Sequence, residues 1–206
     1  MNSIVLSYHL KLFKEESVIT GMLQNGLSHF HLRKPDLNIN EYRKIIELIP
    51  AEFHKRIVLH SHFELLNEFD LKGYYITSSE RGVVAEPQGN HIRSTFANSF
   101  DELENLDGKY DYFLMGPIFK SISKPNLTVK FNHEYLRSEF NSRQLRSKVL
   151  AIGGIRENST EMAINYGFDG VVILGAVWAL YMETFDIRKA VDQYVSINNV
   201  AVVMKN

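Results

Sequence analysis

Two glycine-containing strand ends carry the first groups in this sequence that could bind a phosphate. Gly153-Gly154 lies in the run VLAIGGI (residues 149–155), and Gly175 follows in GFDGVVILGA (residues 167–176). Glycine has no Cβ, so its backbone N–H can approach an anion closely. A glycine pair also serves simply to end a strand and turn the chain. Two such units in succession favour the phosphate site.

The stretch GPIFKSISK, residues 116–124, adds side-chain donors. Ser121, Ser123 and Lys124 offer two hydroxyls and a cation within four residues, and such groups suit phosphate oxygens. An ordinary polar surface loop could have the same content. The apolar Ile118-Phe119 ahead of them indicates instead a loop that packs down onto the protein.

Short apolar runs alternate with helical patterns, and these elements must position the donors. We expect strands at residues 3–7, 27–32, 56–59, 73–77, 91–95, 111–115, 148–152 and 170–174. We expect helices at residues 11–25, 38–49, 62–69, 99–106, 131–140, 158–166 and 187–195, with Asn38 or Asn40 as an N-cap. Residues 78–89 read as a polar loop, and residues 198–206 are left unassigned.

This alternation predicts an α/β fold, a single (β/α)8 TIM barrel over residues 1–206, because it calls for a parallel sheet with right-handed crossovers. No GxGxxG or GxxxxGK[ST] motif follows the first strand, which disfavours an open nucleotide-binding sheet. In this barrel, function lies beyond the carboxyl ends of the strands, and phosphate commonly binds after strands seven and eight. Other polar residues expected at those ends are Arg33, Lys34, His60, Ser61, Glu80 and Ser94.

Composition narrows the classes of function. The 206 residues carry a net charge of −1 and contain no cysteine, so disulfides, thiolate metal sites and cysteine nucleophiles are excluded. A near-neutral chain has no global field to recruit nucleic acid, and no apolar run is long enough to span a membrane. We therefore expect a cytoplasmic protein that binds phosphorylated small molecules, not nucleic acid or membrane, and a homo-oligomer remains open.

Five segments, taken in order, resemble the thiamine phosphate synthase (thiamine-phosphate pyrophosphorylase)/TenI family. They are HLRKP (31–35), IRS (92–94), DYFLMGPIFKSISK (111–124), LAIGGI (150–155) and GFDGVVILGAV (167–177). The resemblance covers nearly the whole chain and implies a barrel acting in thiamine biosynthesis. Synthases of the family join hydroxymethylpyrimidine diphosphate to thiazole phosphate and release pyrophosphate, using Mg²⁺. TenI-type members rearrange the thiazole instead.

The resemblance also implies roles for individual residues. Arg33 and Lys124 match groups that grip the diphosphate, and with His60 they are the predicted catalytic residues. His31 stands where the family has glutamine, and Lys34 lies beside the position of its lysine. The predicted substrate-binding residues are His31, Lys34, Ser94, Ser121, Ser123, Gly154 and Gly175.

The sequence departs from the family at the metal. The family's Asn-Asp after the third strand is His60-Ser61 here, and its second acid falls near Glu80. Ser61 and Glu80 are thus the implied Mg²⁺ ligands, although serine is a poor replacement for a carboxylate. His60 would suit a softer metal, a proton transfer or a hydrogen bond to a neighbour.

Three functions follow, and we favour the first. In the first, the chain is a synthase-like transferase that uses Mg²⁺ through a degenerate metal site. Alternatively, it is a TenI-type thiazole tautomerase without a metal, with His31 or His60 shuttling the proton. The third function is a non-catalytic barrel that binds thiazole phosphate or thiamine phosphate.

Overall fold

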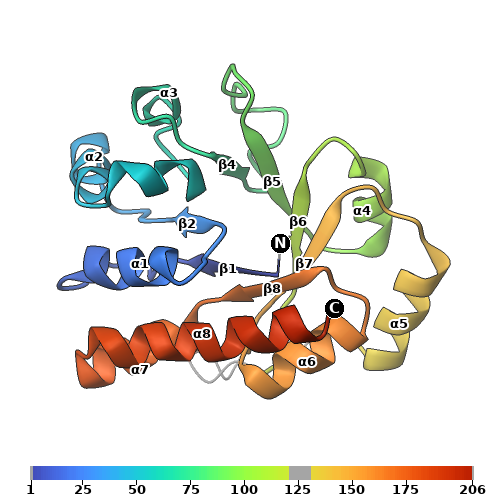
Figure 1. Cartoon of the computed structure of the whole chain (residues 1–206). Helices are drawn as coiled ribbons and strands as arrows, with labels where there is room; N and C mark the ends of the chain where they lie inside the picture. Colours follow the sequence, from blue (N-terminus) through green and yellow to red (C-terminus); the bar gives the residue numbers. More distant parts are fainter. Residues whose placement is uncertain (1, 121–130, 206) are drawn as a thin grey trace.

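The computed structural model describes residues 2–120 and 131–205, and in this part of the chain eight strands form one closed sheet. The strands are β1 (Ser3–Leu6), β2 (Phe30–Leu32), β3 (Ile57–Leu59), β4 (Gly73–Ile76), β5 (Ile92–Ala97), β6 (Tyr112–Met115), β7 (Lys148–Ile152) and β8 (Gly170–Ile173). Each pairs in parallel with the next, and β8 pairs with β1 (Figure 1). The predicted single (β/α)8 barrel is confirmed.

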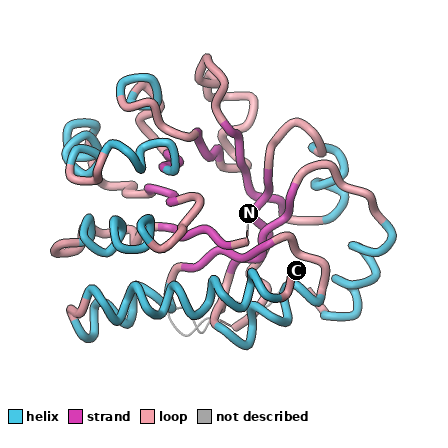
Figure 2. The backbone as a smooth tube through the Cα atoms, viewed as in Figure 1, coloured by secondary structure: helices cyan, strands magenta, loops and turns pink. Residues whose placement is uncertain are grey.

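Helices surround the strands, as Figure 2 shows in cyan around magenta. They are α1 (Glu15–Gln24), α2 (Ile39–Glu47), the 3-10 helix η1 (Ala51–Arg56), α3 (Leu65–Glu68), α4 (Phe100–Leu106), α5 (His133–Ser142), α6 (Glu157–Asn165), α7 (Gly175–Thr184) and α8 (Ile187–Val203). Asn38 caps α2 as predicted, because its side chain accepts from the backbone of Asn40 and Glu41. Within the described ranges, no helix is long and apolar enough to cross a membrane.

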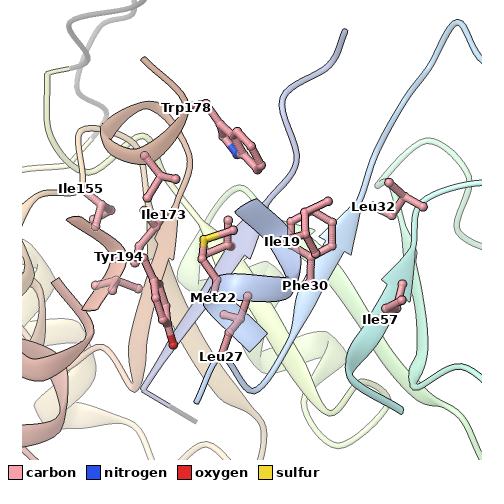
Figure 3. Close-up of a cluster of buried hydrophobic side chains, with 14 of the residues drawn as sticks. Ile19, Met22, Leu27, Phe30, Leu32, Ile57, Ile155, Ile173, Trp178 and Tyr194 are labelled. Atoms are coloured by element: carbon pink, nitrogen blue, oxygen red, sulfur yellow. The ribbon is translucent and has the colours of Figure 1, made fainter. Parts of the chain in front are cut away.

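Alternation along the strands sorts the core into two layers. Tyr112 and Leu114 belong to the cluster inside the barrel, whereas Phe113 and Met115 belong to the larger cluster between strands and helices. This follows from the period of two, which sends successive side chains to opposite faces. In Figure 3, Ile19 and Met22 of α1 lie beside Phe30 of β2 in the outer layer.

Several predicted boundaries were wrong. Helix α7 was not predicted, and α8 continues through the unassigned tail to Val203. Helix α1 begins at Glu15 rather than residue 11, β2 begins at Phe30 rather than residue 27, and α3 is a single turn. The polar loop is confirmed: residues 77–91, all of them described, join β4 to β5 through turns without a helix.

Candidate anion-binding site at the carboxyl ends of the strands

Two cavities open where the strands end. One, here called the glycine cavity, has a volume of about 440 Å³ and lies at the ends of β7 and β8. The other, the arginine cavity, has a volume of about 380 Å³ and lies at the ends of β2, β3 and β4. Because all eight strands are parallel, both cavities belong to the same end of the barrel, the end that carries function in this fold.

Gly153 and Gly154 give the glycine cavity its backbone wall. Both have left-handed backbone angles, with φ of +100° and +67°. A Cβ on Gly154 would lie 2.6 Å from the carbonyl oxygen of Lys120 and 2.8 Å from Cβ of Phe119. The Ser159 hydroxyl holds the same turn, because it donates to the Gly154 carbonyl at 2.8 Å and accepts from Arg156 N–H. Glycine is therefore required here by both conformation and space.

The start of α7 supplies the second wall. Gly175 is its first residue and lines the cavity with Ala176. The first N–H groups of a helix have no intrahelical acceptor, and no side chain among the described residues caps α7. The ten-residue helix also carries no acid in its first turn. Open N–H groups at a positive helix end favour an anion of the phosphate class.

The segment after β6 packs against this region as the sequence predicted. Ile118 is fully buried, and its N–H donates to the Ile152 carbonyl at 3.0 Å. Phe119 N–H donates to the Gly153 carbonyl at 3.1 Å. Ser121, Ser123 and Lys124 lie outside the described residues, so their roles at the phosphate stay predictions.

Arg33 is the cation of the arginine cavity. It is exposed, and no acid of the described residues pairs with it. Ser7 at the end of β1 fixes its backbone, accepting from Arg33 N–H at 2.8 Å and donating to its carbonyl at 2.9 Å. The backbone of Arg33 is thus fixed at the cavity, and its exposed guanidinium is available to an anion. Its contact with a diphosphate stays a prediction.

Lys34 lies differently from the prediction that it binds substrate. Its side chain is fully buried, and Nζ contacts Glu15 Oε2 at 2.5 Å and the Leu10 carbonyl at 2.7 Å. Burial lowers the pKa of Lys34 and raises that of Glu15, while their mutual attraction opposes both shifts. Alternation explains the position: Arg33 and Lys34 are consecutive, so their side chains leave the chain on opposite sides. This ammonium is engaged by the protein itself.

The residues implied as Mg²⁺ ligands are also engaged by protein groups. The Ser61 hydroxyl donates to the Tyr42 hydroxyl at 2.9 Å, and Glu80 Oε2 accepts from the backbone and hydroxyl of Thr77. Across residues 2–120 and 131–205, no three His, Asp or Glu side chains are grouped to hold a metal ion. Mg²⁺ prefers carboxylate and phosphate oxygens. The described donors of this cavity therefore do not fit that ion.

His31 and His60 meet, as neither the motif nor the spacing indicated. His31 Nδ1 lies 2.9 Å from His60 Nε2, and His31 Nε2 lies 2.6 Å from the Tyr112 hydroxyl. His60 also stacks on Tyr75 with ring centroids 4.2 Å apart. Loss of solvation, then repulsion by Arg33, lowers the pKa of His60 to about 3. Burial, then the neighbouring histidines, lowers the pKa of His31.

These values bear on the predicted proton transfer by His60. A histidine with a pKa near 3 is uncharged at neutral pH and is a weak base, so this geometry favours a hydrogen-bonding role over acid–base catalysis.

Ser94 is fully buried, and its hydroxyl donates to the Tyr74 carbonyl at 3.2 Å. Its contact with substrate stays a prediction.

Sequence reasoning missed the tyrosines that support the arginine cavity. Tyr42 accepts from Lys34 N–H at 2.7 Å as well as from Ser61. Tyr112 could have been found, since alternation along β6 places it inside the barrel with His31. Tyr42 sits on α2, and no local pattern marks which helical residue reaches a strand end.

Comparison with known proteins shows the family of the chain. The sequence model of the family described as "Thiamine monophosphate synthase" matches residues 4–177. The thiamine-phosphate synthase of Bacillus mycoides (strain KBAB4) is 24% identical over 169 residues, covering 78% of this chain and 77% of the relative. That of Lysinibacillus sphaericus (strain C3-41) is 22% identical over 192 residues, covering 89% and 88%.

A solved structure is similar over almost the full length. The thiamine phosphate pyrophosphorylase of Bacteroides thetaiotaomicron superposes with a TM-score of 0.85 at 29% identity and covers 98% of each chain. The family match runs from β1 through β8 into the first turn of α7, and it includes all lining residues of the arginine cavity and most of those of the glycine cavity. The chain therefore belongs to the thiamine monophosphate synthase family.

Proposed function

We propose that the chain joins hydroxymethylpyrimidine diphosphate to thiazole phosphate and releases pyrophosphate. One observation carries the proposal: two cavities with different polar linings open at the same end of the barrel. The arginine cavity suits a diphosphate, because Arg33 is free there for bidentate contact. The glycine cavity suits a phosphate monoester, because its donors are backbone N–H groups.

The reaction makes modest demands on side chains. The bond between the pyrimidine methylene carbon and the diphosphate oxygen breaks, and both electrons leave with pyrophosphate. The thiazole nitrogen then forms the new C–N bond with the resulting cation. Arg33 stabilises the charge that develops on the departing pyrophosphate, and the two cavities hold the reacting rings in place. Lys124 is proposed to assist from the segment after β6.

The requirement for Mg²⁺ is a separate proposal that the described donors do not support. Ser61 and Glu80 are bonded to Tyr42 and Thr77, so substrate oxygens would have to supply most of the ligands of a bound ion. An assay with and without a chelator answers this directly. We expect product in both, with a smaller effect of the chelator than a carboxylate metal site would give.

The test of function is an assay for thiamine phosphate from the two substrates, with Arg33→Gln as the key variant. Removing one positioned donor to a developing charge costs about 10²- to 10³-fold in kcat, while stability changes by less than about 0.5 kcal/mol because Arg33 is exposed. Arg188→Gln is the matched control, since Arg188 is 90% exposed on α8. Full activity of Arg33→Gln would refute the assignment. Thiazole rearrangement without coupling would instead establish the tautomerase.

A further inference from the structure

A hydrogen-bonded row of three side chains runs through the barrel into the arginine cavity. Tyr112 of β6 lies at its inner end, His31 of β2 in the middle and His60, just beyond β3, at the cavity. Tyr112 is 2% exposed and His31 is fully buried. Neither can reach solvent, so each must satisfy its polar atoms within the protein.

The proton of Tyr112 sets the direction of the row. Its closest acceptor is His31 Nε2 at 2.6 Å. If this O–H donates to Nε2, His31 must carry its own proton on Nδ1. That N–H then donates to His60 Nε2 at 2.9 Å, and His60 must carry its proton on Nδ1. Each proton position follows from the one before it.

His60 ends the row and lines the arginine cavity. Nε2 is turned inward to His31, so Nδ1 remains for a ligand, and no described residue is hydrogen-bonded to it. Stacking on Tyr75 fixes the plane of the ring. Arg33 lines the same cavity and discourages a second proton on His60. An uncharged, fixed N–H donor beside a guanidinium is suited to an anion oxygen.

We propose that Tyr112 and His31 are positioning residues that hold His60 as its Nδ1–H tautomer, with that N–H donating to a diphosphate oxygen in the arginine cavity. The identity of the anion rests on the proposed function. The tautomer and its cause do not.

Ser94 offers the competing arrangement. It neighbours the Tyr112 hydroxyl, and a proton directed from Tyr112 to Ser94 would reverse the row and leave His60 protonated on Nε2. Because the Ser94 hydroxyl donates to the Tyr74 carbonyl, its oxygen could only accept from Tyr112, as this competing arrangement requires. What favours the row as described is the close contact of 2.6 Å between the Tyr112 hydroxyl and His31 Nε2. The two arrangements differ in one observable, the nitrogen of His60 that carries the proton.

Long-range ¹H–¹⁵N spectra of the uniformly ¹⁵N-labelled protein at neutral pH distinguish the tautomers, with His60 assigned by its loss in His60→Gln. We expect Nδ1–H in the wild type and a mixture in Tyr112→Phe. Tyr194→Phe is the matched control, because Tyr194 is a buried tyrosine whose hydroxyl has no partner among the described residues. An Nε2–H tautomer in the wild type, or the same tautomer in Tyr112→Phe, would overturn the proposal.

Calorimetric titration with pyrophosphate tests the consequence for binding. Tyr112→Phe should weaken binding about two- to tenfold, the worth of one neutral hydrogen bond, while Tyr194→Phe leaves it unchanged. His31→Leu should weaken it similarly, whereas His31→Gln should restore it, since an amide can accept from Tyr112 and donate to His60. Unchanged binding in both Tyr112→Phe and His31→Leu would refute the role in binding. Failure of the synthase assay alone, with these results intact, would refute only the proposed function.

Discussion

At the scale of single residues, Lys34 and Glu15 form an ion pair in the interior with exposures of 0% and 1%. Glu15 Oε2 is bonded to Lys34, but Oε1 is buried without a partner among the described residues. Burial of this kind costs free energy that only a complete pair offsets. The pair also fastens the loop between β1 and α1, because Nζ donates to the Leu10 carbonyl.

Breaking this pair should destabilise the fold without changing the cavities. We expect Lys34→Met to lower the free energy of unfolding by about 3–5 kcal/mol, because it leaves Glu15 buried and unpaired. The double variant Lys34→Met/Glu15→Leu should recover most of that loss. Urea unfolding measures both, and Arg188→Ala, which breaks an exposed pair with Asp192, should cost less than about 0.5 kcal/mol. A double variant as unstable as the single one would contradict this account.

The position of Arg33 and of the glycines at the carboxyl ends of strands could be predicted, because residue type and strand end are both features of the local sequence. The fate of Lys34 could not be predicted in the same way, since its partner lies 19 residues earlier in another element. The hydrogen bond between His31 and His60 likewise depends on the closed barrel, which places β2 beside β3. The closed barrel also places β6 across the interior from β2. Spacing along the chain carries no signal for such contacts.

At the scale of elements, Asp107 ties the end of α4 to the start of β7. Its Oδ1 accepts from the backbone N–H of Ser147 at 2.8 Å and of Arg146 at 3.0 Å. Partial burial works to raise its pKa, but these N–H donors outweigh it and lower the pKa below 3.8. The carboxylate therefore binds a proton less readily in the native state than in the unfolded chain.

Stability should depend on pH through this group. The stabilisation from Asp107 is complete above its unfolded pKa of about 3.8 and is lost as pH falls through the lower native pKa. We expect Asp107→Asn to cost about 1–2 kcal/mol at pH 7 and progressively less below pH 4. Asp101→Asn is the control, because Asp101 is 86% exposed. Urea unfolding from pH 2.5 to 7 measures the free energy of unfolding of both variants. The same dependence on pH in Asp107→Asn and Asp101→Asn would contradict this account.

A substitution in the turn between β7 and α6 tests the close packing at the glycine cavity. Gly154→Ala should lose about 1–2 kcal/mol from its left-handed backbone alone, and more from the contact with the Lys120 carbonyl. Gly26→Ala is the matched control, since its φ is +87° but nothing lies within 4 Å of a new Cβ. We expect Gly154→Ala to be clearly less stable in urea unfolding and to bind thiazole phosphate less tightly. Equal losses in the two variants would refute the close packing at Gly154.

Strands were easier to predict than helices for a physical reason. Most strands are short apolar runs because the barrel buries both of their faces, whereas β5, with the sequence IRSTFA, is only partly buried. Helix α7 was missed because its residues are apolar almost without a break from Ala176 to Met182, so the pattern does not mark the one face, with Val177, Trp178 and Tyr181, that is buried. The C-terminal part of α8 was missed because Ile197 and Ala201 are its only fully buried residues after Tyr194 among those described.

At the scale of the whole molecule, the closed sheet brings two separate cavities to one end while keeping their donors on different strands. The glycine cavity depends on β7, β8 and α7, and the arginine cavity depends on β2, β3 and β4. They share no lining residue. Two ligands held by independent parts of one rigid barrel should stabilise it independently.

Thermal unfolding with two ligands can measure that independence. A ligand at one hundred times its Kd adds about 2.7 kcal/mol, which raises the Tm of a chain of this size by about 5–10 °C. We expect pyrophosphate and thiazole phosphate together to raise the Tm by more than either alone. In Arg33→Gln the shift by pyrophosphate should shrink while that by thiazole phosphate remains, and Gly154→Ala should show the reverse. If either ligand abolished the shift given by the other, both would occupy one cavity, and the assignment of the diphosphate to Arg33 would fail.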